Sequence, residues 1–319
     1  MSSEMESISI AIVTYGVVTR EIKICLKSLE KEIKVNDEIL IIHEGNDLQF
    51  KNIESLAKEN KHKIKCVRLI ENRGLSNGRN LALDICKTKW ITFIDDDAKL
   101  LDGWREALDR GFTRYPDSPG FTGPLIPIYE TDIRKLPPEM EWVVSCDSFG
   151  GKIDKTTRNG FGANMTFNND KLNEYNLKFD SKLGWVGGHE GVGLAGEETV
   201  FSMKINEYSE YPIMWLYDLK VGHHVPMTRM TLRYVINRSR KEGRTKSYIS
   251  KNTISGSSSN SLGKEIKHLI KTIFIGIPRE IIRIPIKPTA SLWNISGIIL
   301  MITNTGLGFI GEKMSRKKN

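Results

Sequence analysis

The feature that most constrains the fold is an alternation of short apolar runs with helical segments over the first hundred residues. The runs are ISIAIVT (8–14), DEILIIH (37–43), KIKCVRLI (63–70) and WITFIDDD (90–97). Segments with helical spacing follow the first three runs, at 20–31, 49–60 and 76–87. Because strands buried on both faces are continuously apolar, and alternation with helices implies parallel pairing, the sequence predicts an α/β fold with a mostly parallel open sheet.

Such a sheet binds its ligand in the crevice at the carboxyl ends of the strands. The residues expected at that edge are Thr14, Tyr15, Glu44, Asn72 and Asp95. The turn after the first strand, TYGVVTRE, holds one glycine, whereas a dinucleotide-binding turn needs G-x-G-x-x-G, and the chain has no P-loop pattern. These observations disfavour NAD-type dehydrogenases and P-loop kinases or ATPases.

Asp95, Asp96 and Asp97 form the strongest chemical signal in the sequence. Adjacent carboxylates repel each other unless a cation or a structural partner offsets the repulsion. On a strand, Asp95 and Asp97 share one side and Asp96 faces the other. Mg²⁺ and Mn²⁺ commonly bind through one or two carboxylates plus substrate phosphates, whereas the alternative is an acidic turn that caps the next helix. The position at the carboxyl edge of the sheet favours the metal.

The net charge differs between three parts of the chain. Residues 1–225 hold 29 Lys and Arg against 35 Asp and Glu, residues 226–251 hold 8 against 1, and residues 264–319 hold 10 against 3. The uncharged segment NTISGSSSNSLG between them is typical of a flexible linker. The sequence therefore predicts a catalytic domain at 1–251, a linker at 252–263 and a tail at 264–319, with an anionic partner at the C-terminal end.

The tail has two parts. Residues 264–287 alternate Ile-rich steps with Lys and Arg, as an interfacial helix does, and residues 288–311 carry no charge. The second part is long enough to span a bilayer, but its Asn, Ser, Thr and Gly weaken that interpretation. We expect peripheral association with anionic lipid at the cytoplasmic face of a membrane. A membrane span and a helical pair that packs back on the main domain are the alternatives.

The cysteines and the N-terminus bear on the compartment. Cys25, Cys66, Cys86 and Cys146 form no C-x-x-C pair, so neither a disulfide framework nor structural zinc is expected, and a reducing cytoplasm fits best. The first residues, MSSEMESISI, show no signal-peptide pattern.

The motifs ISIAIVTYG, EILIIHEG, NRGLSNGRNLAL and FIDDD, in this order and spacing, resemble family 2 glycosyltransferases of the GT-A fold. The resemblance continues through GFGANMTFNNDKL, GEETVFSMKI and HHVPMTRMTLRYVINRSRKEGRTKS, and so covers about residues 8–247. It implies a GT-A nucleotide-diphospho-sugar transferase fold with a helical C-terminal appendage. It also implies an inverting, hexosyltransferase-type enzyme. Such an enzyme uses Mn²⁺ or Mg²⁺ to move a sugar from a nucleotide-sugar donor to a hydroxyl of a glycan or lipid-linked acceptor.

The resemblance also implies roles for individual residues. Thr14, Tyr15 and Glu44 would line the nucleoside base and ribose, and Arg79 would contact the base or organise that pocket. Asp95 would touch the ribose and the metal, and Asp97 would bind the metal. The substrate-binding set is completed by Asn72 and Asp96.

Glu198 is the expected catalytic base, with Glu197 as its acidic partner or an acceptor contact. A carboxylate within hydrogen-bond reach can take the proton of an attacking sugar hydroxyl, whereas the alternative is that both are first-turn acids favoured by a helix dipole. His223 or His224, of which only one is expected to face the site, would contact the diphosphate or the metal.

Two positions depart from the family pattern. His43-Glu44-Gly45-Asn46 stands where Asp-Asp-Gly-Ser is usual, and Glu197-Glu198 stands where Glu-Asp is usual. These substitutions support one alternative, a non-catalytic membrane-associated protein that retains the GT-A fold. A metal-dependent nucleotidyltransferase is the other alternative.

A cationic stripe follows the histidines. The basic residues there are Arg229, Arg233, Arg238, Arg240, Lys241 and Arg244, and on a helix 229, 233, 240 and 244 fall near one face and make the stripe. Arginine binds phosphate bidentately, so the stripe is expected to bind the donor diphosphate, a phosphorylated lipid acceptor or membrane headgroups. A solvated surface is the alternative, and nucleic acid is not expected because no aromatic residues are interleaved.

Overall fold

The computed structural model of the chain describes residues 6–69, 74–131, 135–148, 151–184, 194–252 and 268–315. They fall into two compact units. The first unit comprises Met1–Ile126 and Gly150–His223, and the second comprises Pro127–Phe149 and His224–Asn319. Residues 226–251 therefore group with the tail helices, whereas the sequence placed them in the first 251 residues. The predicted linker lies almost wholly outside the described residues, and the predicted domain limits stay a prediction.

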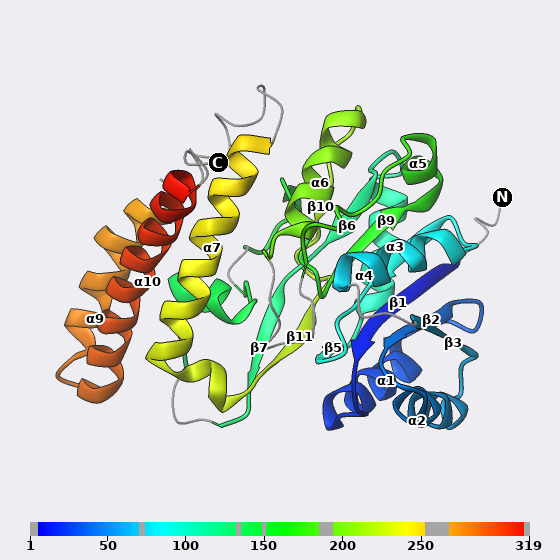
Figure 1. Ribbon diagram of the computed structural model, residues 1–319, viewed down its shortest axis with the longest axis horizontal. Coiled ribbons are helices and arrows are strands. Elements are labelled where there is room, and N and C mark those ends of the chain that lie inside the picture. The colour runs from blue at the N-terminus through cyan, green and yellow to red at the C-terminus, as the bar shows by residue number, and fades with distance from the viewer. Residues whose placement is uncertain are drawn as a thin grey trace. The chain divides into compact units, whose positions relative to one another are not determined.

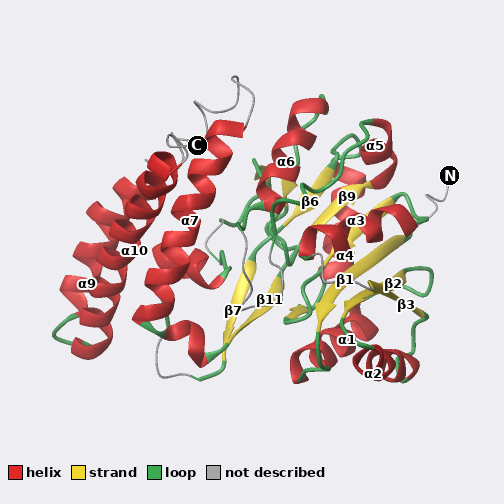
Figure 2. Ribbon diagram, in the orientation of Figure 1, coloured by secondary structure: helices red, strands yellow, loops and turns green. Residues whose placement is uncertain are grey.

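An eight-stranded sheet forms the centre of the first unit, in the order β3-β2-β1-β4-β9-β6-β10-β8 (Figures 1 and 2). Its strands are β1 (Ile8–Tyr15), β2 (Glu38–Glu44), β3 (Ile64–Leu69), β4 (Trp90–Phe93), β6 (Gly120–Thr122), β8 (Lys155–Thr156), β9 (Met165–Asn168) and β10 (Met214–Trp215). β1 pairs in parallel with β2 and with β4, and β2 pairs in parallel with β3. β9 is antiparallel to both of its neighbours, β4 and β6. The predicted α/β fold with a mostly parallel open sheet is confirmed.

Helices pack on both faces of this sheet. They are α1 (Arg20–Glu32), α2 (Asp47–Lys58), α3 (Leu75–Ile85), α4 (Trp104–Arg114), α5 (Asn169–Glu174) and α6 (Glu197–Tyr208). Because side chains alternate along a strand, Ile8, Ile10 and Ile12 of β1 join one apolar cluster with α1, α2 and α4. Ala11 joins the other cluster, with α3, α5 and α6. Each isoleucine removed from water in this way stabilises the fold by roughly 1.5–3 kcal/mol.

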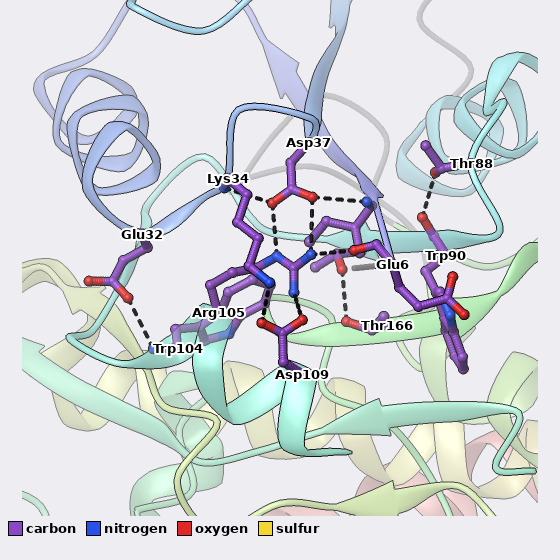
Figure 3. A network of polar contacts seen from close by, with 12 residues as sticks. Glu6, Glu32, Lys34, Asp37, Thr88, Trp90, Trp104, Arg105, Asp109 and Thr166 are labelled. Carbon is purple, nitrogen blue, oxygen red and sulfur yellow. Dashed lines mark hydrogen bonds and ion pairs between the residues drawn. The ribbon is translucent and has the colours of Figure 1, made fainter. Parts of the chain in front are cut away.

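A buried arginine ties the first strand to α4 (Figure 3). The Arg105 guanidinium contacts both carboxylate oxygens of Asp37, at 2.8 and 3.1 Å, pairs with Asp109, and donates to the carbonyl of Glu6 at 2.6 Å. Asp37 also accepts from the backbone N–H of Ile8 at 3.0 Å. The entry of β1, the turn before β2 and the first turn of α4 are thereby fixed together.

The fourth strand is shorter than the sequence predicts. β4 ends at Phe93, and Ala98 N–H donates to the carbonyl of Asp95 at 3.1 Å, so the three aspartates lie in a turn before β5 (Ala98–Leu100). The expectation that the strand reaches Asp97 is wrong. β5 then pairs antiparallel with β11 (Val221–Val225), and His223 lies opposite Ala98.

The second unit is mainly helical. Its helical elements are η1 (Pro138–Val144), η3 (Met227–Met230), α7 (Leu232–Asn252), the π-helical turn η4 (Thr272–Gly276), α9 (Ile277–Arg283) and α10 (Pro288–Ser315). The strands β7 (Leu125–Tyr129) and β11 each run from the first unit into the second. α10 packs along α7 and against α9 (Figure 1). The apolar core of this unit includes Met140, Val143 and Val235, together with Ile298 and Met301 of α10.

Candidate functional site

Two carboxylates and an imidazole converge at the turn after β4. The pairing of β5 with β11 brings His223 Nε2 to 3.2 Å from Asp97 Oδ1. Asp95, Asp97 and His223 each offer one ligand atom, and these atoms all lie within 4.8 Å of one another. Asp97 and His223 are buried and Asp95 is half-buried. Carboxylate oxygens with one imidazole nitrogen fit a divalent cation such as Mn²⁺ or Mg²⁺.

Asp96 points to a different partner. Its carboxylate accepts a hydrogen bond from Thr14 Oγ1 at 2.5 Å. Thr14, next to the last residue of β1, lies in register with His43 of β2, and Tyr15 lies in register with Glu44. Asp96 therefore has a different partner from Asp95 and Asp97, and it is a turn, not the predicted strand alternation, that separates them.

Glu44 is a buried carboxylate at the carboxyl end of β2. Burial raises the pKa of Glu44, while a hydrogen bond from the backbone N–H of Gly74 opposes the shift. Its Oε1 atom has no hydrogen-bond partner among the residues that the structure describes. A buried acceptor in this state can receive a ligand N–H or O–H. The neighbouring His43 side chain contacts the carbonyl of Gly16 at 2.8 Å.

Arg79 connects three parts of the first unit. It extends from α3, and its Nη1 donates to Glu197 Oε1 at 2.8 Å. Its Nη2 lies 3.3 Å from Asp95 Oδ1 and 3.3 Å from the carbonyl of Gly162. The side chain is buried, and its cation also lies over the rings of Phe93 and Phe179. These contacts link the aspartate turn, the start of α6 and the backbone at Gly162, and a role of Arg79 at the nucleoside base stays a prediction.

Glu197 and Glu198 begin α6 immediately after Gly196, whose φ of 95° suits glycine. Glu197 is buried against Arg79, and Glu198 is partly exposed. Loss of hydration raises the pKa of Glu198, and the negative charge of Glu197 raises it further, against the opposing effect of Arg79. A carboxylate with a raised pKa is a stronger proton acceptor once it is ionised.

The structure does not place every predicted residue in this group. Asn72 is outside the described residues. His224 belongs to the second unit, whereas His223 belongs to the first, so the structure distinguishes the two histidines. In the stripe on α7, Arg240 donates to Asn304 Oδ1 and Arg244 pairs with Glu312, both at 3.1 Å, so these two arginines contact α10.

Two contacts of the site were not predicted. Gly162 approaches Arg79 so closely that a Cβ atom there would lie 2.9 Å from Nη2, and the only sequence signal is the glycine within GFGANM. Cys25 of α1 lies below the aspartate turn, with Sγ 3.8 Å from the carbonyl of Asp95. Burial raises the pKa of the Cys25 thiol, and the three aspartates raise it further. No sequence pattern relates this cysteine to the turn.

The mostly parallel sheet with an aspartate turn at its carboxyl edge matches the GT-A fold of glycosyltransferases. Mannosyltransferase PcManGT from Pyrobaculum calidifontis, solved with GDP-Man and Mn²⁺, superposes with a TM-score of 0.60 at 13% identity, covering 95% of this chain and 88% of that one. TarS 1–349 of S. aureus superposes with a TM-score of 0.53 at 14% identity, covering 98% and 92%.

Residues 9–172 match the family described as glycosyl transferase family 2, and the chain belongs to that family. A curated relative, glucosyl-dolichyl phosphate glucuronosyltransferase of Haloferax volcanii, is 25% identical over 214 residues. That match covers 66% of this chain and 66% of the relative, just under two thirds of its length.

Proposed function

We propose that the protein is an inverting, hexosyltransferase-type glycosyltransferase. Its donor is a nucleotide-diphosphate sugar and its acceptor is a hydroxyl of a glycan or a lipid-linked glycan. The observation that carries the proposal is the convergence of Asp95, Asp97 and His223 within 4.8 Å at the carboxyl edge of the sheet. Membership of glycosyl transferase family 2 supports the reaction class. The Mn²⁺ and GDP-Man of the mannosyltransferase structure support a metal-assisted donor site.

In this proposal, Asp95, Asp97 and His223 hold Mn²⁺ or Mg²⁺, which neutralises charge on the diphosphate when bound. Thr14, Tyr15 and Glu44 line the nucleoside. Asn72 and Asp96 complete the donor site, and Asp96 positions Thr14 through the hydrogen bond between them. Glu44, with its buried Oε1, supplies the acceptor for a base N–H or a ribose hydroxyl.

Glu198 is the proposed base. The acceptor oxygen forms a bond to C1 of the sugar on the face opposite the diphosphate, and the bond from C1 to the diphosphate oxygen breaks. The proton of the acceptor hydroxyl passes to Glu198, and the nucleotide diphosphate leaves with the bonding electrons. A single displacement of this kind inverts the configuration at C1. Glu197, held by Arg79, keeps a negative charge beside Glu198, which supports its basicity.

We also propose that the enzyme works at the cytoplasmic face of a membrane with anionic lipid, and without nucleic acid as a partner. Among the described helices, α10, with 28 residues, is long and apolar enough to cross a membrane by length and composition. The Haloferax relative is named for glucosyl-dolichyl phosphate, which supports a lipid-linked acceptor.

The donor site is tested by the melting temperature of the full chain with UDP, GDP, dTDP or CDP, with and without Mn²⁺. A nucleotide at one hundred times its Kd stabilises the fold by about 2.7 kcal/mol, so one base is expected to give a metal-dependent rise. The rise should disappear in Asp97→Ala and persist in Asp170→Ala, which removes an exposed carboxylate of the first unit. If no nucleotide raises the melting temperature, the donor-site proposal is wrong.

The base is tested separately by sugar transfer. Glu198→Gln should lower kcat by about 10²–10⁴-fold, since it removes general-base catalysis, while the nucleotide-dependent melting shift stays at the wild-type value. A Glu198→Gln enzyme that transfers sugar at the wild-type rate would show that another group accepts the proton.

A further inference from the structure

The outer face of the segment 268–287 in the second unit is strongly apolar. Phe274, Ile282 and Ile286 are 72%, 75% and 79% exposed. Further exposed apolar side chains of this segment are Leu269, Ile270, Ile273, Ile275 and Ile281. The helix α10, which packs against α9 (Figure 1), exposes Leu292, Ile299, Leu307 and Ile310. Gathered apolar side chains on a surface mark an interaction site.

The inner side of the same segment is charged. Glu280 is fully buried, accepts from Asn294 Nδ2 of α10 at 2.9 Å, and pairs with Arg283 at 3.1 Å. Arg279 forms a two-point contact, at 2.7 and 3.2 Å, with the buried carboxylate of Glu139 in η1. This arrangement fixes the rotation of α9 about its axis. Rotating α9 so that its isoleucines face inward would leave the buried carboxylates of Glu139 and Glu280 without their partners, which would destabilise the fold.

Small residues build part of the contact between α7 and α10, beside the apolar cluster of Val235, Ile298 and Met301. Ser239, Gly243 and Ser247 recur every four residues on α7 and are buried. A Cβ atom on Gly243 would lie 2.0 Å from the carbonyl oxygen of Thr305, and one on Gly308 would lie 2.1 Å from that of Arg240. Small residues let the two backbones approach closely, as in helix pairs that associate within lipid. The leucines and isoleucines of α10 listed above are left on its other faces.

We propose that the outer face of the segment 268–287, with the adjoining face of α10, docks on a lipid bilayer that contains anionic phospholipid. Buried ion pairs and small residues at the helix contacts, together with large apolar side chains that are exposed, match a surface whose solvent is lipid. Lys271 and Lys287 of this segment are exposed, and residues 264–319 carry 10 Lys and Arg against 3 Asp and Glu. Anionic headgroups complement this charge, whereas a second copy of the same face would oppose it with like charge.

The cations also set the depth of docking. They are spread along the segment, so it lies at the headgroup boundary, with its apolar side chains entering by about 5–10 Å. The inference names the surface behind the peripheral location proposed above. It does not depend on sugar transfer.

The test is flotation of the full chain with vesicles of phosphatidylcholine alone or with about a third phosphatidylglycerol. The variant is Phe274→Ser/Ile282→Ser. The matched control is Val35→Ser/Ile153→Ser, which removes side chains that are 89% and 75% exposed in the first unit. The wild type and the control should float with the anionic vesicles, and the variant should bind roughly tenfold more weakly or less. Binding to phosphatidylcholine alone should be weaker for all three.

Because the four replaced side chains are exposed, all proteins should melt at the same temperature and retain the same nucleotide-dependent melting shift. Failure of the wild type to float would overturn the inference, as would equal flotation of the wild type and Phe274→Ser/Ile282→Ser. A wild-type dimer that this variant converts to a monomer would also overturn it, because a second copy would then cover the face.

Discussion

Arg79 offers the sharpest test of how the first unit is held together. Arg79→Met removes the cation that contacts Glu197, Asp95 and the carbonyl of Gly162. Glu197 is buried, and its Oε2 atom has no hydrogen-bond partner among the described residues, so its charge loses its main compensation. Removing one partner of a buried ion pair costs about 3–5 kcal/mol, and we expect a loss of that size in the free energy of unfolding.

The assay is urea denaturation followed by tryptophan fluorescence, since Trp90, Trp104 and Trp215 are buried in the first unit. Arg110→Met is the matched control, because Arg110 and its partner Asp218 form an exposed pair whose loss costs about 1 kcal/mol or less.

A double-mutant cycle separates the stranded charge from lost packing. Glu197→Gln introduced into Arg79→Met removes that charge, so the double variant should recover about 1–3 kcal/mol relative to additivity. If Arg79→Met is no worse than Arg110→Met, or if the two substitutions are additive, the central role given to Arg79 is refuted.

Four further outcomes are expected. Arg105→Met should cost about 3–5 kcal/mol by urea denaturation, because it strands the buried carboxylate of Asp37, and a loss below about 1 kcal/mol would contradict the network in Figure 3. Gly243→Ala should destabilise by about 1–3 kcal/mol, because its Cβ meets backbone. In Gly306→Ala the new Cβ meets no atom within 4 Å, so this variant should raise the free energy of unfolding by about 0.5–1 kcal/mol. Equal melting temperatures for Gly243→Ala and Gly306→Ala would refute the close packing of α7 on α10. Glu198 must be ionised to accept a proton, so activity falls as the pH falls through its pKa. Because the pKa of Glu198 is raised, the acid limb of the kcat/KM profile is expected at a higher pH than is usual for glutamate. A limb within the usual range would contradict the assignment of Glu198.

Local patterns in the sequence determined much of the fold of the first unit. Apolar runs and helical spacing located the first four strands and three helices, because burial on both faces leaves a continuous apolar signature. The observed ends of these strands and helices differ from the predicted ends by a few residues, and the differences have local causes. α2 begins at Asp47 because Asn46 and Gln49 form a capping box. β4 stops at Phe93 because the three aspartates turn the chain.

The long-range contacts were decided by the tertiary structure alone. Arg79 and Glu197 are 118 positions apart, and no periodicity in the sequence encodes their pairing. His223 lies beside Asp97, in preference to its neighbour His224, because the register between β5 and β11 sets which residue faces the turn. In the second unit, the sequence indicated an amphipathic tail with basic residues. Which side of α9 faces inward depends on the ion pairs of Glu280 and Glu139, and these form only once η1, α9 and α10 are packed together.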